Sequence, residues 1–190
     1  MRPPELDESA LTPSQREVFA RIRSGPRGLV QGPLRVWLHS PELADAAQAL
    51  GAFCRYGTSL GQDLSELAII TVGAWWRAGF EWHVHAPLAI AAGIPEAAVE
   101  AIRVGHSPSL ERHHALVHRA TQEMMESRDW SDATYAALLA ELGLAGTVEL
   151  TGIIGYYGLI CMTINGFRVP VPEGVPEPFP GRTPSQTTAR

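Results

Sequence analysis

Residues 66–93, ELAIITVGAWWRAGFEWHVHAPLAIAAG, decide the fold and hold the polar side chains on which any chemistry depends. The apolar residues recur at helical spacing and an Ala-Gly pair interrupts them, which predicts a hairpin of two helical arms. Glu66 lies on the first arm, and Glu81 and His85 lie on the second. A spacing of four puts Glu81 and His85 on one face of the second arm, one turn apart.

Two interpretations of the Glu81–His85 pair stay open. A carboxylate beside an imidazole can hold one tautomer and move a proton, which is the basis of general acid–base catalysis. A carboxylate in the first turn of a helix is also favoured by the free N–H groups and the helix dipole alone. The sequence therefore identifies a candidate catalytic pair that a capped helix would equally explain.

Most of the remaining chain also has helical signals. Ser or Thr before Pro marks several helix starts, and Gly marks several ends. One stripe at helical spacing is formed by Leu43, Ala46, Ala47, Leu50 and Phe53. No segment shows clear period-two alternation, so we predict an all-α fold. The expected helices cover about 13–22, 41–56, 64–76, 81–93, 96–104 and 107–127, with one more starting near 132 and a last one over 145–167.

The length of 190 residues suits one domain with a real core. We assign this helical domain to residues 1–168. Residues 169–190 hold six prolines and little periodic apolar pattern, which predicts an extended or disordered tail that could lie across a neighbour.

Charge and cysteine content bear on partners and compartment. A formal charge of −5 without a basic stripe argues against nucleic acid. Cys54 and Cys161 form no CxxC, and the N-terminus lacks a signal peptide's apolar core, so we expect a cytoplasmic protein. The uncharged run 150–167 contains several glycines and no basic flank upstream, which favours a buried helix over a membrane span. A helix apolar around its whole circumference also predicts self-association.

Other motifs carry less weight. His114 and His118 are four residues apart and could bind a metal, but charged neighbours favour a solvated helix face. Glu66, Glu81 and His85 could also suit a cation, although their spacing does not demand one. We predict no metal and no cofactor. The sequence contains no GxSxG, Walker or GxGxxG motif.

Three stretches, 32–44, 66–94 and 148–170, resemble the carboxymuconolactone decarboxylase family, which includes the alkylhydroperoxidase D-like proteins. The most specific part is Glu, a spacer, and an aromatic-Glu-Trp-x-x-His-x-x-x-Ala segment followed by Ala-Gly-Ile. The likeness covers roughly residues 28–172. It implies an all-helical bundle that assembles into dimers, trimers or hexamers.

The departure from the family pattern concerns its redox motif. Alkylhydroperoxidase D-like members carry CxxCxxxH, with a Glu twelve residues before the first cysteine. In this chain His85 takes the histidine place, Glu81 the second cysteine place, Ala78 the first, and Glu66 that of the upstream carboxylate. Neither Ala nor Glu can attack a peroxide or resolve a sulfenic acid, so dithiol peroxidase chemistry is not expected.

Proton transfer is the chemistry left to these side chains. We expect a cofactor-independent enzyme acting on an organic acid or lactone, by decarboxylation or isomerisation. His85 would be the general acid/base, Glu81 would orient it, and Glu66 would be a second proton carrier. The expected substrate-binding residues are Trp82, Trp76 and Arg77, with Arg35 and Arg168 as further cations that the sequence does not place.

Two alternatives from other classes stay open. In a non-catalytic member, the same polar residues would form a satisfied buried network in an oligomeric scaffold or ligand-binding protein. The second alternative is a peroxidase or peroxiredoxin-type oxidoreductase, which the family label suggests and the missing CxxC disfavours.

Overall fold

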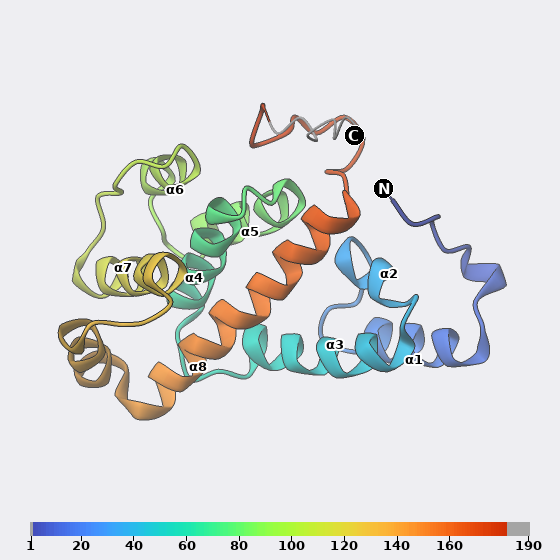
Figure 1. Ribbon diagram of the computed structural model, residues 1–190, viewed down its shortest axis with the longest axis horizontal. Coiled ribbons are helices and arrows are strands. Elements are labelled where there is room, and N and C mark those ends of the chain that lie inside the picture. Colours follow the sequence, from blue (N-terminus) through green and yellow to red (C-terminus); the bar gives the residue numbers. More distant parts are fainter. Residues whose placement is uncertain (1, 182–190) are drawn as a thin grey trace, which may run out of the picture.

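The computed structural model describes residues 2–181, and within that range the chain is all-helical with no strand (Figure 1). A short 3-10 helix at Glu8–Ala10 precedes eight α-helices. They are α1 (Pro13–Ser24), α2 (Pro33–Trp37), α3 (Pro41–Tyr56), α4 (Gln62–Trp75), α5 (Gly79–Ala91), α6 (Glu96–Arg103), α7 (Arg112–Ser127) and α8 (Asp132–Phe167).

Helices α4 and α8 form the centre of the bundle. Figure 1 shows α8 crossing the whole molecule, and it packs against α2, α3, α4, α5 and α7. Helix α4 packs against α5, α7 and α8, and every residue from 65 to 73 is buried. A helix buried on all sides leaves no water for its polar side chains, so each of them needs a protein partner.

The observed helices differ from the predicted ones at two places. The short helix α2 was not predicted. Helix α7 begins at Arg112 rather than near 107, because Leu110 packs on a small apolar cluster while the chain is still extended. The last two predicted helices correspond to the two parts of α8, which meet at a kink at Gly143, where φ is +69°. A glycine tolerates this left-handed value without a steric penalty.

Most of the apolar stripe predicted on α3 is turned outward in the single chain, and of its five residues Ala47 alone is buried. Leu43, Leu50 and Phe53 are each nearly half exposed. The buried face is made instead by smaller residues, which are Ala44, Ala47, Gly51 and Cys54. Small side chains let α3 lie close to α8, and the large apolar ones are left on the surface.

The segment after α8 is extended over 169–181 and anchored to the bundle. Phe179 is buried against Trp82, with ring centroids 5.5 Å apart. Arg103 and Arg77 donate hydrogen bonds to the carbonyl oxygens of Pro178 and Pro180. The predicted tail extends further, but residues 182–190 lie outside the described part of the chain.

Helix α8 is also the one described helix that is long and apolar enough to cross a membrane, judged by length and composition. One third of its most apolar 18-residue window is buried within the chain. The core helix of a soluble protein has the same length and apolar composition as a membrane-spanning helix.

Candidate functional site

The hairpin of α4 and α5 brings three buried polar residues together. Helix α4 ends at Trp75 with Trp76 as its C-cap, and Arg77 takes the left-handed conformation, with φ at 49°, to reverse the chain. The two helices then run antiparallel, with Gly73 of α4 lying opposite Glu81 of α5. In this register Glu66, near the start of α4, reaches His85, one turn beyond Glu81.

His85 lies between two carboxylates. Its Nδ1 is 2.7 Å from Oε2 of Glu66, and its Nε2 is 3.0 Å from Oε1 of Glu81. All three side chains are no more than 5% exposed. The ring edge of Tyr157 packs against the imidazole at 5.2 Å between centroids.

The contacts at both nitrogens favour a protonated imidazole, because a carboxylate accepts hydrogen bonds and an imidazolium can donate two. Burial disfavours the charged ring, but the charge of Glu81 and the hydrogen bonds that the ring donates to Glu66 and Glu81 outweigh it. Together they raise the pKa of His85 to about 9. At neutral pH the site therefore holds an imidazolium between two acceptors.

The raised pKa of His85 predicts a pH-dependent stability. The folded protein binds this proton more tightly than a chain with the ordinary value of 6.5, so the stabilisation is complete below pH 6.5 and lost as pH rises through about 9. We expect this histidine to contribute a fall in unfolding free energy on the order of 3 kcal/mol across that window. Urea denaturation at a series of pH values gives the unfolding free energy of the wild type and of His85→Gln. The contribution of His85 is the difference between the two plots of unfolding free energy against pH. The same pH dependence of unfolding free energy in both proteins would contradict the prediction.

A pocket of about 190 Å³ opens beside the Glu81–His85 pair. Its walls come from the loop before α2 and from α2, α3, α5 and α8. Glu81 and His85 form part of one wall, whereas Glu66 does not line the pocket. The polar lining residues are Arg27, Gln31, Arg55, Tyr56, Glu81, His85, Tyr156 and Tyr157.

Arg27 is held in this pocket by α3 and α8. Its Nη2 donates a hydrogen bond to the Tyr156 hydroxyl at 3.1 Å. Gly51 permits this arrangement, since a Cβ there would lie 2.0 Å from the Tyr156 hydroxyl and 2.2 Å from Arg27 Nη2. The Nε of Arg27 is buried and has no hydrogen-bond partner among the described residues.

Tyr157 is a second donor that lacks a partner. Its hydroxyl is buried and makes no hydrogen bond within residues 2–181. Burial, reinforced by the charges of Glu81 and Glu66, raises the pKa of Tyr157 well above its usual value. The hydroxyl therefore stays protonated and can donate a hydrogen bond to an oxygen atom of a ligand.

None of the predicted substrate-binding residues, Trp82, Trp76 and Arg77, lines this pocket. Trp82 is covered by Phe179 of the C-terminal segment. The backbone carbonyl of Trp76 accepts a hydrogen bond from the Asn165 side-chain amide, and the Trp76 side chain packs on the main core. Arg77 lies over the Phe179 ring and donates to Pro180. The reversal after α4 turns all three away from the site.

The two carboxylates lie differently with respect to the pocket. Glu81, predicted to orient His85, is the carboxylate that faces the pocket. Glu66, predicted as a second proton carrier, lies behind the imidazole on Nδ1 and outside the pocket lining. Glu66 is thus placed to orient the ring, and Glu81 is placed to meet a ligand.

The other predicted candidates lie elsewhere. His114 pairs with Asp63 at 2.7 Å, while His118 contacts Thr71 instead, so His114 and His118 do not converge on one ion. Donor atoms of Asp63, His113 and His114 do lie within 4.8 Å of one another. Arg35 pairs with Glu8, and Arg168 is exposed at the end of α8.

Arg27, Arg55, Tyr156 and Tyr157 were not among the predicted site residues, although all four line the pocket. Arg27 follows a Gly-Pro pair in a loop, and Arg55 is near the end of α3. Neither position has a spacing relation to Glu81 along the chain. The two adjacent tyrosines on an otherwise apolar helix were the one local signal.

The sequence matches no protein-family model and none of the curated proteins. Its fold does match solved structures. A peroxidase-related protein from Ralstonia eutropha, described as an alkylhydroperoxidase AhpD core, gives a TM-score of 0.72 at 15% identity, over 90% of this chain and 92% of that one. An uncharacterized peroxidase-related protein from Silicibacter gives 0.70 at 13% identity, over 90% of each chain.

A third match is a protein of unknown function from Agrobacterium tumefaciens, proposed to be the antioxidant defence protein AhpD. It gives a TM-score of 0.64 at 17% identity, over 75% of this chain and 99% of that one. Identities this low show the fold and no more. The predicted fold class is confirmed: this chain has the all-helical AhpD-like fold.

Proposed function

We propose that this protein is a cofactor-independent enzyme that moves a proton on an organic acid or lactone, by decarboxylation or isomerisation. The observation that supports this function most is that Arg27 and Tyr157 line the pocket beside Glu81 and His85, while Arg27 Nε and the Tyr157 hydroxyl are buried without a hydrogen-bond partner among the described residues. Buried polar groups nearly always have partners. Two donors without one, next to an acid–base pair, favour a pocket built for the oxygen atoms of a ligand.

The charges in the pocket favour a ligand with a carboxylate. Arg27 and Arg55 both line it, and a guanidinium can bind a carboxylate through two parallel hydrogen bonds. The one lining carboxylate is Glu81, which is already hydrogen-bonded to His85. An acid bound to the arginines would therefore lie beside Glu81.

Isomerisation needs a proton removed from one carbon and a proton returned at another. Glu81 would take a proton from a carbon next to a carbonyl, and the electron pair of that C–H bond would move onto the carbonyl oxygen. The Tyr157 hydroxyl would stabilise that oxygen by donating a hydrogen bond. Glu81 would then return the proton at another carbon of the conjugated system. Positioned proton transfer of this kind is worth typically ~10²–10⁴-fold in rate.

Decarboxylation uses the same groups in a different order. The bond to the carboxylate breaks, carbon dioxide leaves, and the electron pair remains in the conjugated system of the lactone. His85, an imidazolium at neutral pH, then supplies the proton through Glu81 to the carbon. Glu66 would keep the imidazole ring in position during this transfer.

The direct test uses carboxymuconolactone and related unsaturated lactone acids in D₂O, followed by proton NMR. Loss of carbon dioxide, or deuterium appearing next to the carbonyl, would support the function. Saturable binding with neither reaction would instead favour the ligand-binding alternative. Absence of both binding and reaction across the series would overturn the proposal.

The same reasoning predicts that the protein does not reduce organic hydroperoxides with a dithiol. The CxxC positions hold Ala78 and Glu81, and the two cysteines, Cys54 and Cys161, are buried elsewhere. Burial raises the pKa of the Cys54 thiol, which keeps the thiolate scarce. A coupled assay with a dithiol reductant should show only the background rate. A robust rate lost in Cys54→Ser or Cys161→Ser would show that the redox site was misplaced.

We also propose that the protein self-associates through its outward apolar surface. On α3 this surface consists of Leu43, Leu50, Phe53 and Tyr56, and on α8 it includes Leu144, Val148, Met162 and Phe167. Each of these side chains is at least 44% exposed in the single chain. Large exposed apolar surfaces of this kind typically mark protein interfaces.

Self-association predicts a mass of at least twice 20.6 kDa by light scattering at micromolar concentration. Leu50→Glu together with Phe53→Glu should shift the protein toward the monomer, because a charge buried at an interface is strongly unfavourable. Leu29→Glu, at an exposed position in the loop before α2, is the matched control. A clean monomer peak for the wild type would rule the association out.

A further inference from the structure

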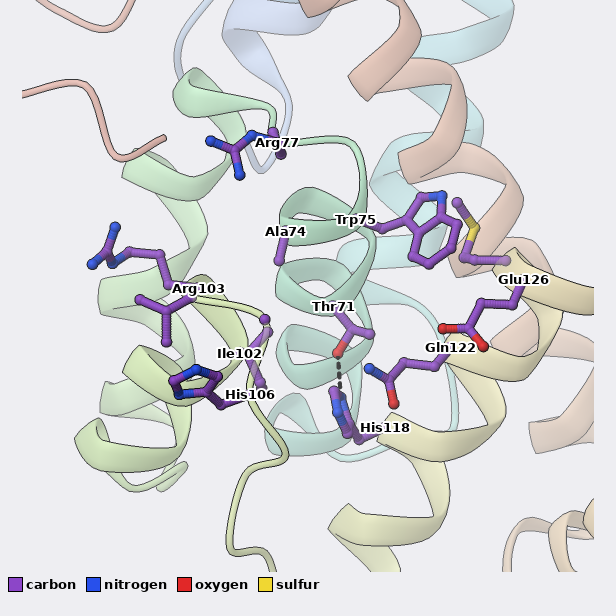
Figure 2. A pocket seen from close by; sticks show the side chains of 13 residues that line it. Thr71, Ala74, Trp75, Arg77, Ile102, Arg103, His106, His118, Gln122 and Glu126 are labelled. Carbon is purple, nitrogen blue, oxygen red and sulfur yellow. Dashed lines mark hydrogen bonds between the residues drawn. The ribbon is translucent and has the colours of Figure 1, made fainter. Parts of the chain in front are cut away.

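A second pocket, of about 310 Å³, lies between α4, α6 and α7. It shares no lining residue with the pocket at Glu81. Figure 2 shows Ile102 and His106 on one side, Trp75, Gln122 and Glu126 on the other, and Thr71 with His118 between them. Its chemistry depends on one of these residues, His118.

The neighbours of His118 fix its tautomer. The Thr71 hydroxyl donates its proton to the Leu67 carbonyl at 2.7 Å. The same oxygen lies 3.0 Å from His118 Nδ1, so it can only accept there, and Nδ1 carries the hydrogen. The other ring nitrogen, Nε2, is therefore a hydrogen-bond acceptor.

The acceptor nitrogen of His118 is unused. The residue is 6% exposed, its ring lines the pocket, and Nε2 has no hydrogen-bond partner within the described part of the chain. Burial lowers the pKa of His118 to about 4, so the ring is neutral at physiological pH. A buried lone pair with nothing to accept from is costly, and a ligand that donates a proton removes that cost.

The rest of the wall favours an aromatic ligand. Trp75 presents a half-exposed indole, and Met125 and Ile102 add a thioether and an aliphatic side chain. These groups contact the face and edge of an aromatic ring well. A cavity of ~150 Å³ is known to hold benzene, so this pocket has room for a substituted ring.

Both arginines at the pocket are engaged already, and the remaining charged lining residue, Glu126, is a carboxylate that would also repel an anionic ligand. Arg103 pairs with Glu100 and with the carbonyl of Pro178, and Arg77 donates to Pro180. The lone pair of His118 would repel a carboxylate placed against it. The lining thus favours an uncharged ligand with one hydroxyl at its inner end.

We propose that this pocket binds a phenol-type ligand, with the phenolic hydroxyl donating its hydrogen bond to Nε2 of His118 and the ring lying against Trp75. This site is separate from the Glu66–His85–Glu81 group and does not depend on the proton-transfer function. It would give the protein a second small-molecule site for hydroxylated aromatic compounds.

The test compares phenol with anisole, which has a similar ring and no hydroxyl hydrogen. Long-range proton–nitrogen NMR of the ¹⁵N-labelled full-length protein follows the Nε2 resonance of His118 during each titration. Phenol should shift this resonance saturably toward lower frequency. Anisole should bind at least about tenfold more weakly, which is the difference that one hydrogen bond makes.

Variants separate the hydrogen bond from simple filling of the pocket. His118→Phe should abolish the preference for phenol over anisole, whereas His39→Phe, at an exposed position, should keep it. His85→Gln should also keep it, whatever becomes of the proposed enzyme activity. Three results with the wild type alone would each overturn the proposal. They are equal affinity for phenol and anisole, a His118 Nε2 shift that grows linearly without saturating, and resonance shifts centred on His85.

Discussion

Glu81→Gln is expected to lower the rate of proton transfer on the eventual substrate by about 10²–10⁴-fold while leaving the melting temperature within a few degrees. The amide oxygen can still accept the hydrogen bond from His85 Nε2, which now spans 3.0 Å to the carboxylate. What the variant loses is the base that faces the pocket. Deuterium incorporation in D₂O gives the rate, and thermal unfolding gives the stability.

The control for Glu81→Gln is His83→Gln, which changes a half-buried residue of the same helix that does not line this pocket. That variant should keep the wild-type rate. His85→Gln should lose activity as well, and it should also cost about 1–3 kcal/mol, because a neutral amide cannot serve both carboxylates. If Glu81→Gln kept full activity, Glu81 would not be the base.

Glu66→Ala is expected to give the largest loss of stability, about 3–5 kcal/mol, because it leaves the buried charge of His85 without its inner partner. Glu66 is 2% exposed and lies behind the ring, where water from the pocket does not replace it. Glu66→Gln should cost less, since its amide oxygen can still accept from Nδ1. Urea denaturation near pH 7 measures both values.

Glu100→Ala is the matched control for Glu66→Ala. Glu100 also pairs with a cation, Arg103 at 2.6 Å, but its side chain is 57% exposed. Exposed ion pairs contribute little, so the expected change is below about 1 kcal/mol. Equal losses in Glu66→Ala and Glu100→Ala would mean that His85 is not held as a buried cation.

Much of the site could be predicted from the sequence because its main elements are local. The i, i+4 spacing of Glu81 and His85 and the break before Gly79 follow from helix geometry and from a few neighbouring residues. The hairpin then places Glu66 on the facing arm. For the same reason, the missing CxxC could be seen directly in the sequence.

The outward stripe on α3 shows where local pattern was insufficient. Spacing identified Leu43, Leu50 and Phe53 as one helix face, but it could not tell whether the chain itself covers that face. In the structure the smaller residues face α8, and the large ones stay exposed. Only the packing of whole helices decides which face is inside.

The sequence by itself determined the all-helical fold, the pairing of Glu81 with His85 and the absence of a CxxC motif, since each depends on residues a few positions apart. The tertiary structure alone decided that Arg27 and Tyr157, 130 positions apart, share one pocket with Glu81, and that Trp82, Trp76 and Arg77 do not. It also decided which carboxylate faces the ligand and left His118 an unused acceptor. Helical periodicity acts over one or two turns, whereas a pocket is made where distant helices cross, and that crossing is set by the packing of the whole core.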